Sequence, residues 1–307
     1  MTAGNALMAR SLVPEACILG EGIQWDRAAG RVRWTDVQGR RLHDCAADGS
    51  DHRRVDLPAR VSAFALDAAG GMLCAFEDGI GSFDPASGAR VLLHRFEPDL
   101  PTTRLNDGRC DRAGRFLVGG VEEKGLRPIS SVISYDGAGP PRTLIRDVGC
   151  ANSIAFSPDG SLMYFADTAG QDIFVYDYDQ ATGEIANRRV FATLDRAEGR
   201  PDGSCVDAQG RLWNALFGSG RVQAFNPDGS RGPTLFLPSA RATCPCFGGP
   251  GLGTLYVTTA RILMTEAEKA AMPEAGTTYA FDARAAFGAT GLPESLFGRP
   301  VAGLVPG

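Results

Sequence analysis

The chain has 307 residues, of which 44% are hydrophobic and 22% charged, a composition that supports a sizeable folded core. Its net charge of −5 argues against a nucleic-acid partner, because binding to a phosphate backbone normally requires a basic face. No apolar run approaches the roughly 18 residues of a membrane span, and the start lacks the apolar stretch of a signal peptide. We therefore expect a soluble, cytoplasmic protein without membrane contact.

A turn followed by an apolar strand recurs six times along the chain. The turns use acidic, glycine, proline or serine residues, the types that favour tight turns, and most end in glycine. The copies are residues 26–37, 67–77, 111–120, 157–168, 207–217 and 249–260. They begin 41 to 50 residues apart, which is the period of a four-stranded propeller blade. A further short strand follows each copy, and an apolar strand suited to the ring axis precedes it.

These repeats predict an all-β fold, a six-bladed β-propeller with four-stranded antiparallel blades around a central channel. We expect one domain over residues 1–307, as a monomer or a weak homo-oligomer. The alternative is a β-sandwich with coincidental turns. Residues 292–297 are expected to pair near the N-terminal strands and close the ring, since closure protects open sheet edges. One helix is expected at residues 265–272, where Thr265 and Glu268 form a capping box.

The cysteine and histidine residues offer little chemistry in this pattern. Eight cysteines are spread singly through strand-like runs, which favours buried free thiols in a reducing compartment. The pair Cys244 and Cys246 lacks the spacing of a zinc motif. We expect His43, His52 and His94 to serve surface or packing roles. The chain has no G-x-S-x-G sequence, which disfavours a Ser-His-Asp hydrolase.

Four oxygen-bearing side chains occupy equivalent places in the repeat. Glu21, Asn106, Asn152 and Asp202 each stand five residues before a repeat turn. Equivalent positions of different blades should face the same point on the axis, so these side chains are expected to converge there. Carboxylate and amide oxygens suit Ca²⁺, Mg²⁺ or Mn²⁺, and Zn²⁺ is compatible with them. The competing interpretation is that each is an ordinary turn residue.

Five sequence blocks resemble the successive signatures of the regucalcin / senescence-marker-protein / gluconolactonase family, and in particular its bacterial sugar lactonases. The blocks are LGEGIQWD, RLNDGRCDRAGRFLVGG, ANSIAFSPDGSLMYFADT, RPDGSCVDAQGRLWNALFGSGRVQAFNPDG and CFGGPGLGTLYVTTA, and the resemblance spans residues 15–297. It implies a six-bladed propeller that holds one divalent ion, Ca²⁺, Zn²⁺, Mn²⁺, Mg²⁺ or Fe²⁺. It also implies that Glu21, Asn152 and Asp202 bind this ion.

The resemblance implies that Arg104 and Asn106 contact a sugar substrate, which moves Asn106 from the metal to the substrate or to a metal-bound water. Counting from Asn106 puts Lys124 where some members place a glutamate against the substrate, and lysine is seen there in relatives that act on bacterial sugar lactones. A shift of one residue in this loop would place a neighbouring glutamate there instead. The usual Asn-Gly of the family is Asn152-Ser153 here, a departure that removes no ligand.

The expected function is metal-dependent hydrolysis of a sugar (aldono) lactone to the aldonic acid. The substrate would be a pentono- or hexonolactone such as L-arabinonolactone or gluconolactone, and Asp202 would act as general base. Two alternatives stay open, a calcium-binding or regulatory propeller without turnover and a hydrolase of another ester. The pair Arg104 and Asn106 favours the lactonase, because ion binding alone does not need sugar contacts.

Overall fold

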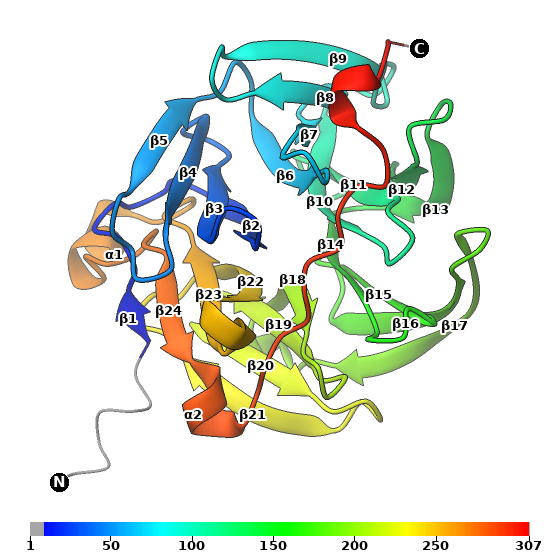
Figure 1. Ribbon diagram of the computed structural model, residues 1–307. Coiled ribbons are helices and arrows are strands. Elements are labelled where there is room, and N and C mark those ends of the chain that lie inside the picture. Colours follow the sequence, from blue (N-terminus) through cyan, green and yellow to red (C-terminus); the bar gives the residue numbers. More distant parts are fainter. Residues whose placement is uncertain (1–8, 307) are drawn as a thin grey trace, which may run out of the picture.

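The computed structural model describes residues 9–306, and strands dominate this part of the chain. Its 24 strands form six four-stranded sheets, which are arranged as a ring around a central axis (Figure 1). All strand pairs within the sheets are antiparallel, as for the innermost pairs of blades one and five. The fold is therefore a six-bladed β-propeller, which confirms the prediction.

The first three blades each run outward from the axis in chain order. Blade one consists of β2 (Gly20–Asp26), β3 (Arg31–Asp36), β4 (Arg41–Ala46) and β5 (Arg53–Asp56). Blade two consists of β6 (Val61–Leu66), β7 (Met72–Phe76), β8 (Gly79–Asp84) and β9 (Ala89–Arg95). Blade three consists of β10 (Thr103–Cys110), β11 (Phe116–Glu122), β12 (Ser130–Tyr135) and β13 (Arg142–Val148).

Blades four and five repeat this order, whereas blade six combines both ends of the chain. Blade four consists of β14 (Ala151–Phe156), β15 (Leu162–Asp167), β16 (Asp172–Asp179) and β17 (Glu184–Thr193). Blade five consists of β18 (Arg200–Val206), β19 (Leu212–Phe217), β20 (Arg221–Phe225) and β21 (Arg231–Phe236). Blade six consists of β22 (Ala242–Gly248), β23 (Thr254–Thr259), β24 (Tyr279–Asp282) and β1 (Arg10–Ser11).

The ring is closed by the N-terminal strand, and the predicted role of residues 292–297 in closure is wrong. Strand β1 pairs antiparallel with β24, with Arg10 opposite Ala280 and Ser11 opposite Tyr279. Residues 292–297 form no strand. They belong to a C-terminal segment, residues 291–304, that crosses the end of the channel from blade six towards blade two (Figure 1). Without β1, the outer edge of β24 would expose unpaired backbone groups, and β1 pairs with them.

In three of the predicted turns, those that begin with Asp67, Asp111 and Asp207, one carboxylate satisfies two backbone N–H groups. In the fifth repeat, Oδ1 of Asp207 accepts from the backbone N of Gln209 at 3.0 Å and of Arg211 at 2.9 Å. Gly210 adopts a φ of 80°, a conformation that glycine reaches without strain. Asp111 makes the same two bonds in the third repeat. All six predicted units contain the expected strand, namely β3, β7, β11, β15, β19 and β23.

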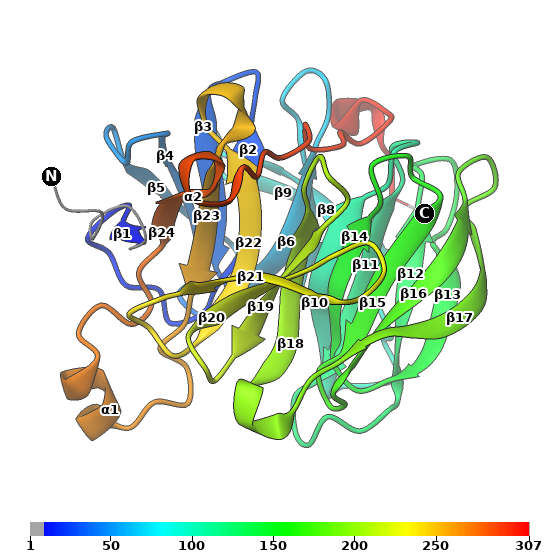
Figure 2. The ribbon, with the colours of Figure 1, turned by 90° about the horizontal axis from the view of Figure 1, so that it is seen from below.

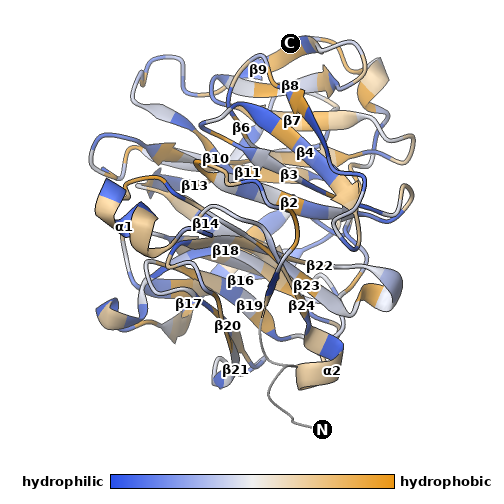
Figure 3. Cartoon of the chain, turned by 90° about the vertical axis from the view of Figure 1, so that its left-hand side faces the viewer, coloured by the Kyte–Doolittle hydropathy of each residue, from blue (hydrophilic) through white to orange (hydrophobic). Residues whose placement is uncertain are grey.

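The hydrophobic core lies between neighbouring blades. Six apolar clusters fill the six interfaces, and one of them joins blade six to blade one through Trp25, Trp34 and Tyr256. Hydrophobic and hydrophilic residues are interleaved along the strands (Figure 3), whereas the inner strands, such as β6 and β14, are buried along their whole length. All eight cysteines are buried and free, which confirms the prediction for them. The channel itself is left for polar side chains.

Helices occupy only the loops. The predicted helix is α1 (Glu266–Ala271), which has Thr265 as N-cap and the expected capping box with Glu268. A second short helix, α2 (Ala283–Phe287), precedes the C-terminal segment, and the 3-10 turns are η1 (Arg196–Glu198), η2 (Pro250–Leu252) and η3 (Val301–Gly303). Figure 2 shows α1 and the C-terminal segment on opposite ends of the ring. Within residues 9–306, no helix is long and apolar enough to span a membrane.

Candidate active site

The site lies where the six innermost strands begin, and a β-bulge interrupts the pairing of each strand there. In blade one the register shifts between Glu21 and Gln24, and in blade five between Pro201 and Ser204. The other four inner strands shift at the matching place. A bulge bends its strand and re-aims a side chain. The bulges therefore turn equivalent residues of different blades towards the axis.

The residues that follow the predicted metal ligands must be small. Gly22 has a φ of 59°, and a Cβ there would lie 2.9 Å from the backbone O of Ser62 in the next blade. A Cβ at Gly203 would lie 2.8 Å from the backbone O of Thr243. Ser153 holds the same place in blade four with a φ of 61°, which is rare for a residue with a side chain. The close approach of the blades therefore depends on these three positions.

Three carboxylates converge at this end of the channel. Burial raises the pKa of Glu21 well above its ordinary value, and the nearby charges of Asp202 and Asp107 raise it further. The pKa of Asp202 is raised by burial and by Asp107, and that of Asp107 by burial. No side chain within residues 9–306 donates a hydrogen bond to Glu21 or Asp202; the donor nearest each carboxylate is the backbone N–H of the following glycine. Buried carboxyl groups therefore gather at this site, and burial and mutual repulsion dominate their pKa values.

Asn152 lies at the matching bulge of blade four, and its side-chain amide is bonded on one side only. Its Nδ2 donates to Oγ1 of Thr168 at 2.7 Å, and Oγ1 of Thr168 donates to the backbone O of Pro201 at 2.7 Å. Within the described chain no donor reaches Oδ1 of Asn152, so this oxygen is free to bind a cation. The side chain is 3% exposed, and its orientation is fixed by these bonds.

A second set of bonds holds the backbone of Asp202. Ser153 Oγ donates to the backbone O of Asp202 at 2.6 Å, and Nδ2 of Asn214 donates to the same oxygen at 2.9 Å. Asn214 Nδ2 also donates to Ser153 Oγ at 2.9 Å. All three residues are buried. Blades four and five are therefore joined at the point from which Asp202 enters the site.

Arg104 and Asn106 lie together at the same site. Arg104 is buried, and its positive charge partly offsets the rise in the pKa of Glu21. Its Nη1 donates to Oδ1 of Asn106 at 2.9 Å, and its Nε donates to Glu123 at 2.9 Å. Asn106 Nδ2 donates to the backbone O of Ala151 at 3.0 Å. Nη2 of Arg104 has no partner in residues 9–306, so it is available to a ligand.

Lys124 is exposed on the loop after β11 and makes no hydrogen bond or ion pair within the described residues. Its neighbour Glu123 instead reaches the site region, where it binds both Arg104 and Arg60. Arg60 holds Glu123 with two nitrogens, at 2.7 and 3.0 Å. Glu123, the neighbouring glutamate that a one-residue shift of the loop would place at the site, thus contacts Arg104, whereas Lys124 does not.

The sequence interpretation missed Asp107, Cys150 and the structural role of Ser153. Asp107 lies within β10, and its Oδ2 accepts from the backbone N of Ile154 at 3.0 Å. The Cys150 thiol lies 3.6 and 3.7 Å from the amide nitrogens of Asn106 and Asn152. Burial and Asp202 raise the pKa of Cys150 to about 12. A bulge inside a strand, which the sequence does not reveal, brings these groups inward.

The other end of the channel is closed. Nη1 of Arg109 binds both carboxylate oxygens of Glu294 at 2.6 and 2.7 Å, and its Nη2 donates to the backbone O of Ser204 at 3.1 Å. The cavity beside this pair measures about 30 Å³, room for about one water molecule. Glu294 comes from the C-terminal segment. A ligand therefore has access to the carboxylates from the opposite end, where the inner strands begin.

The residues present fit a divalent cation. Glu21 and Asp202 are buried carboxylates without side-chain donors, and Asn152 offers a free amide oxygen beside them. Such oxygen-only sets suit hard divalent ions, and a bound cation would remove the charge repulsion that raises both pKa values. Arg104 and Asn106 are bonded to each other and to neighbouring protein groups, and Nη2 of Arg104 stays unpaired within residues 9–306.

Fold and site together define a class, the six-bladed propellers that carry a carboxylate-rich site at the mouth of the axial channel. A family model described as SMP-30/Gluconolactonase/LRE-like region matches residues 19–261. The chain belongs to this family, which confirms the expected relationship.

Individual relatives agree with this assignment. The L-arabinolactonase of Azospirillum brasilense is 41% identical over 277 residues, which cover 89% of this chain and 91% of that protein. Regucalcin of Xenopus laevis is 30% identical over 286 residues, covering 90% and 94%. The crystal structure of a calcium-binding protein, regucalcin, from Agrobacterium tumefaciens is 32% identical, with a TM-score of 0.89 over 95% of this chain and 98% of the other.

Proposed function

We propose that this chain hydrolyses the internal ester of a sugar lactone to the open aldonic acid. A pentono- or hexonolactone such as L-arabinonolactone or gluconolactone is the proposed substrate. The 41% identity to a protein named L-arabinolactonase supports this choice. The observation that carries the proposal is the buried carboxylate pair, Glu21 and Asp202, next to an arginine with a free Nη2. Polar groups around a charged centre suit a ligand rich in hydroxyl groups.

Glu21, Asn152 and Asp202 are the residues proposed to hold a divalent ion, with Ca²⁺, Zn²⁺, Mn²⁺, Mg²⁺ and Fe²⁺ as candidates. When bound, such an ion supplies Lewis-acid polarisation of an ester carbonyl and stabilises negative charge that develops on its oxygen. Thr168 keeps the Asn152 oxygen facing the site. Ser153 and Asn214 fix the backbone that carries Asp202.

Asp202 is the proposed general base. As the oxygen of a water molecule bonds to the lactone carbonyl carbon, Asp202 takes the proton from this water. The bond between the carbonyl carbon and the ring oxygen then breaks, and the same proton passes from Asp202 to the ring oxygen. A carboxylate of ordinary pKa is a weak base, so the burial that raises the pKa of Asp202 brings it closer to the working pH.

Arg104 and Asn106 are proposed to orient the sugar. Nη2 of Arg104 can donate to a hydroxyl group, while Nη1 stays bonded to Asn106. Oδ1 of Asn106 retains a second lone pair that accepts from a sugar hydroxyl. Lys124 remains a proposed contact at the exposed rim, where its mobile ammonium group would meet the substrate only as it enters.

A calcium-binding role without turnover is the second candidate. It is favoured by the 32% identical structure from Agrobacterium tumefaciens, which is described as a calcium-binding protein. The same three oxygen ligands would serve both functions. Arg104 separates the two, because its unpaired Nη2 beside the carboxylates suits a substrate hydroxyl, which ion binding alone does not require.

The test is proton release from a panel of aldono-1,4- and 1,5-lactones, using protein stripped of metal and reloaded with single ions. We expect metal-dependent turnover that Asp202→Asn abolishes. Asp228→Asn is the matched control, because Asp228 is exposed in the β20–β21 turn and an amide oxygen can still accept its bond from Ser230. If no lactone is opened above the spontaneous rate with any ion, while the protein still binds metal, the lactonase proposal is wrong and the calcium-binding role is favoured.

A further inference from the structure

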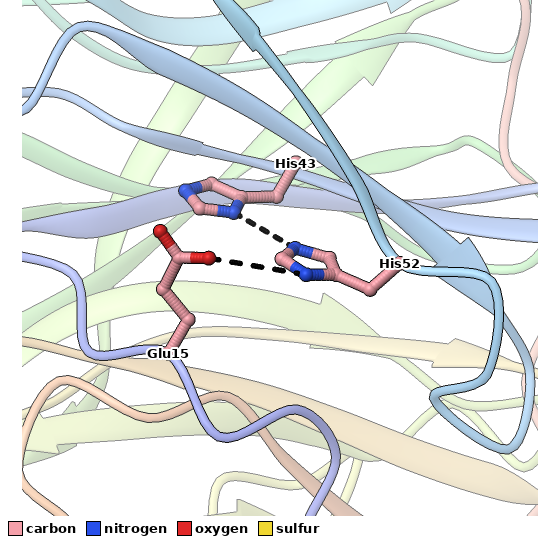
Figure 4. A group of neighbouring side chains, drawn as sticks. All are labelled: Glu15, His43 and His52. Carbon is pink, nitrogen blue, oxygen red and sulfur yellow. Dashed lines mark hydrogen bonds and ion pairs between the residues drawn. The ribbon is translucent and has the colours of Figure 1, made fainter.

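A second cluster of metal-binding side chains lies outside the channel, at the junction of blade six and blade one. One donor atom each from Glu15, His43 and His52 falls within 4.8 Å of the other two (Figure 4). Nδ1 of His43 lies 3.1 Å from Nε2 of His52, and Oε2 of Glu15 lies 3.9 Å from Nδ1 of His52. None of these residues belongs to the carboxylate site described above.

We propose that Glu15, His43 and His52 form a site for a borderline transition-metal ion of the Zn²⁺ type. Two imidazole nitrogens and one carboxylate oxygen are a donor set that zinc uses in proteins, with a water in the fourth position. Two ligands of a tetrahedral zinc ion lie about 3.3 Å apart, close to the observed separation of the two histidine nitrogens. Oε2 of Glu15 faces the other nitrogen of His52, so the carboxylate or the His52 ring would turn to complete the set.

Nδ1 of His43 and Nε2 of His52 are hydrogen-bonded to each other, so an ion would take the place of this bond, while the surroundings fix both rings. Trp34 stacks on His43 with ring centroids 5.0 Å apart and on His52 at 5.8 Å. Cys17 Sγ lies 3.9 Å from Nε2 of His43, on the side of the ring away from His52. A thiol there can hold the Nε2–H tautomer, which leaves Nδ1 free for a metal.

The charges around Glu15 leave one of its oxygens available. Nη1 of Arg54 lies 2.8 Å from Oε1 of Glu15, and Nη1 of Arg41 lies 3.7 Å from the same oxygen. Oε2 faces the histidines instead. Glu15 and His52 are partly exposed, with side-chain exposures of 25% and 21%, so an ion can reach the cluster from solvent.

The position of the cluster suggests what the ion would do. Glu15 lies in the N-terminal arm between β1 and β2, and this arm is bonded to blade six, where Leu12 N donates to Thr278 O and Cys17 N to Gly276 O. His43 lies on β4 and His52 on the loop before β5, both in blade one. A shared ion would therefore tie the arm that closes the ring to the first blade.

The composition of the chain allows a selective test, because it contains only three histidines. We would add Zn²⁺ to the full protein in excess Ca²⁺, which favours the oxygen-only channel site, and follow imidazole ¹H–¹⁵N signals. The expected result is one bound zinc per chain that shifts the His43 and His52 signals and leaves His94 unchanged. Zinc that shifts no histidine signal would overturn the proposal.

Variants sharpen the result. His52→Gln should abolish this zinc binding and Glu15→Gln should weaken it at least tenfold, whereas His94→Gln, the matched control on β9, should bind as the wild type does. Unchanged affinity in His52→Gln would also overturn the proposal, and a thermal melt in EDTA verifies that each variant is folded. Asp202→Asn should still bind zinc at Glu15, His43 and His52. A failure of this zinc proposal is therefore distinguishable from a failure of the proposed lactonase activity.

Discussion

Removal of one buried carboxylate should have opposite effects on stability with and without metal. Glu21 is buried, with Asp202 and Asp107 as negative neighbours and Arg104 as a positive one, and burial and the two carboxylates outweigh Arg104. The change Glu21→Gln removes the charge of Glu21 and keeps the size of the side chain. In EDTA we expect the variant to be more stable than the wild type, because a buried charge that Arg104 only partly offsets disappears.

The magnitude follows from the burial of Glu21, which lies beside two other carboxylates and has no side-chain donor. An unpaired buried polar group costs about 1–3 kcal/mol, and a charged one costs more. Removal of the charge with retention of the amide should therefore recover about 1–3 kcal/mol, which raises the melting temperature by about 2–6 °C in a chain of this size.

Bound metal should reverse the order of the two melting temperatures, so that the wild type is more stable than Glu21→Gln. Saturating metal, at about 1,000 times its Kd, stabilises the wild type by about 4 kcal/mol, and a variant without one charged ligand gains much less. The assay is thermal unfolding in EDTA and in excess Ca²⁺ or Zn²⁺, with the exposed Glu266→Gln as matched control. A melting temperature of Glu21→Gln below that of the wild type in EDTA would refute the argument that the carboxylates repel.

Three further predictions address other parts of the molecule. The raised pKa values of Glu21 and Asp202 mean that these two groups bind more protons in the folded protein than in the unfolded chain, so their contribution to stability falls as pH rises above about 5. In EDTA, the stability advantage of Glu21→Gln over the wild type should therefore grow with pH, and melts of both proteins across pH check the sign. Glu294→Gln leaves Arg109 buried and unpaired and should cost about 3–5 kcal/mol in urea unfolding, whereas replacing both residues by methionine should cost much less. Ser153→Ala removes the hydroxyl that supports the backbone of Asp202, so calorimetry should show metal affinity reduced roughly tenfold; an unchanged affinity would mean that Asn214 suffices.

The repeat was predictable because turn chemistry is local. Asp207 and its equivalents satisfy backbone groups within four residues, so the turns and the strands after them are visible in the sequence. Closure was not predictable in the same way. Strand β1 has two residues, too few for a periodic pattern, and it is stabilised by β24 from the other end of the chain.

The site was predictable in part for the same reason. The shared offset identified Glu21 and Asp202, which the structure brings into electrostatic contact, although their roles stay predictions. Asp107 was missed because a bulge at its neighbour directs it inward. Counting residues from Asn106 favoured Lys124 over Glu123 as the residue at the substrate. The path of the loop decides which of these two neighbours points inward, and only Glu123 contacts Arg104. Glu15, His43 and His52 share no motif, since three separate segments bring them together.

The composition of blade six has a consequence for biosynthesis. Its outer strand, β1, leaves the ribosome almost a full chain length before its partner β24. At about 5–20 residues per second, β1 must wait on the order of tens of seconds for that partner. Blades one to five can form during this time, but the last edge stays open until translation ends. A tag or truncation at the N-terminus would therefore act on the final folding step, although it lies far from the end of the chain that is made last.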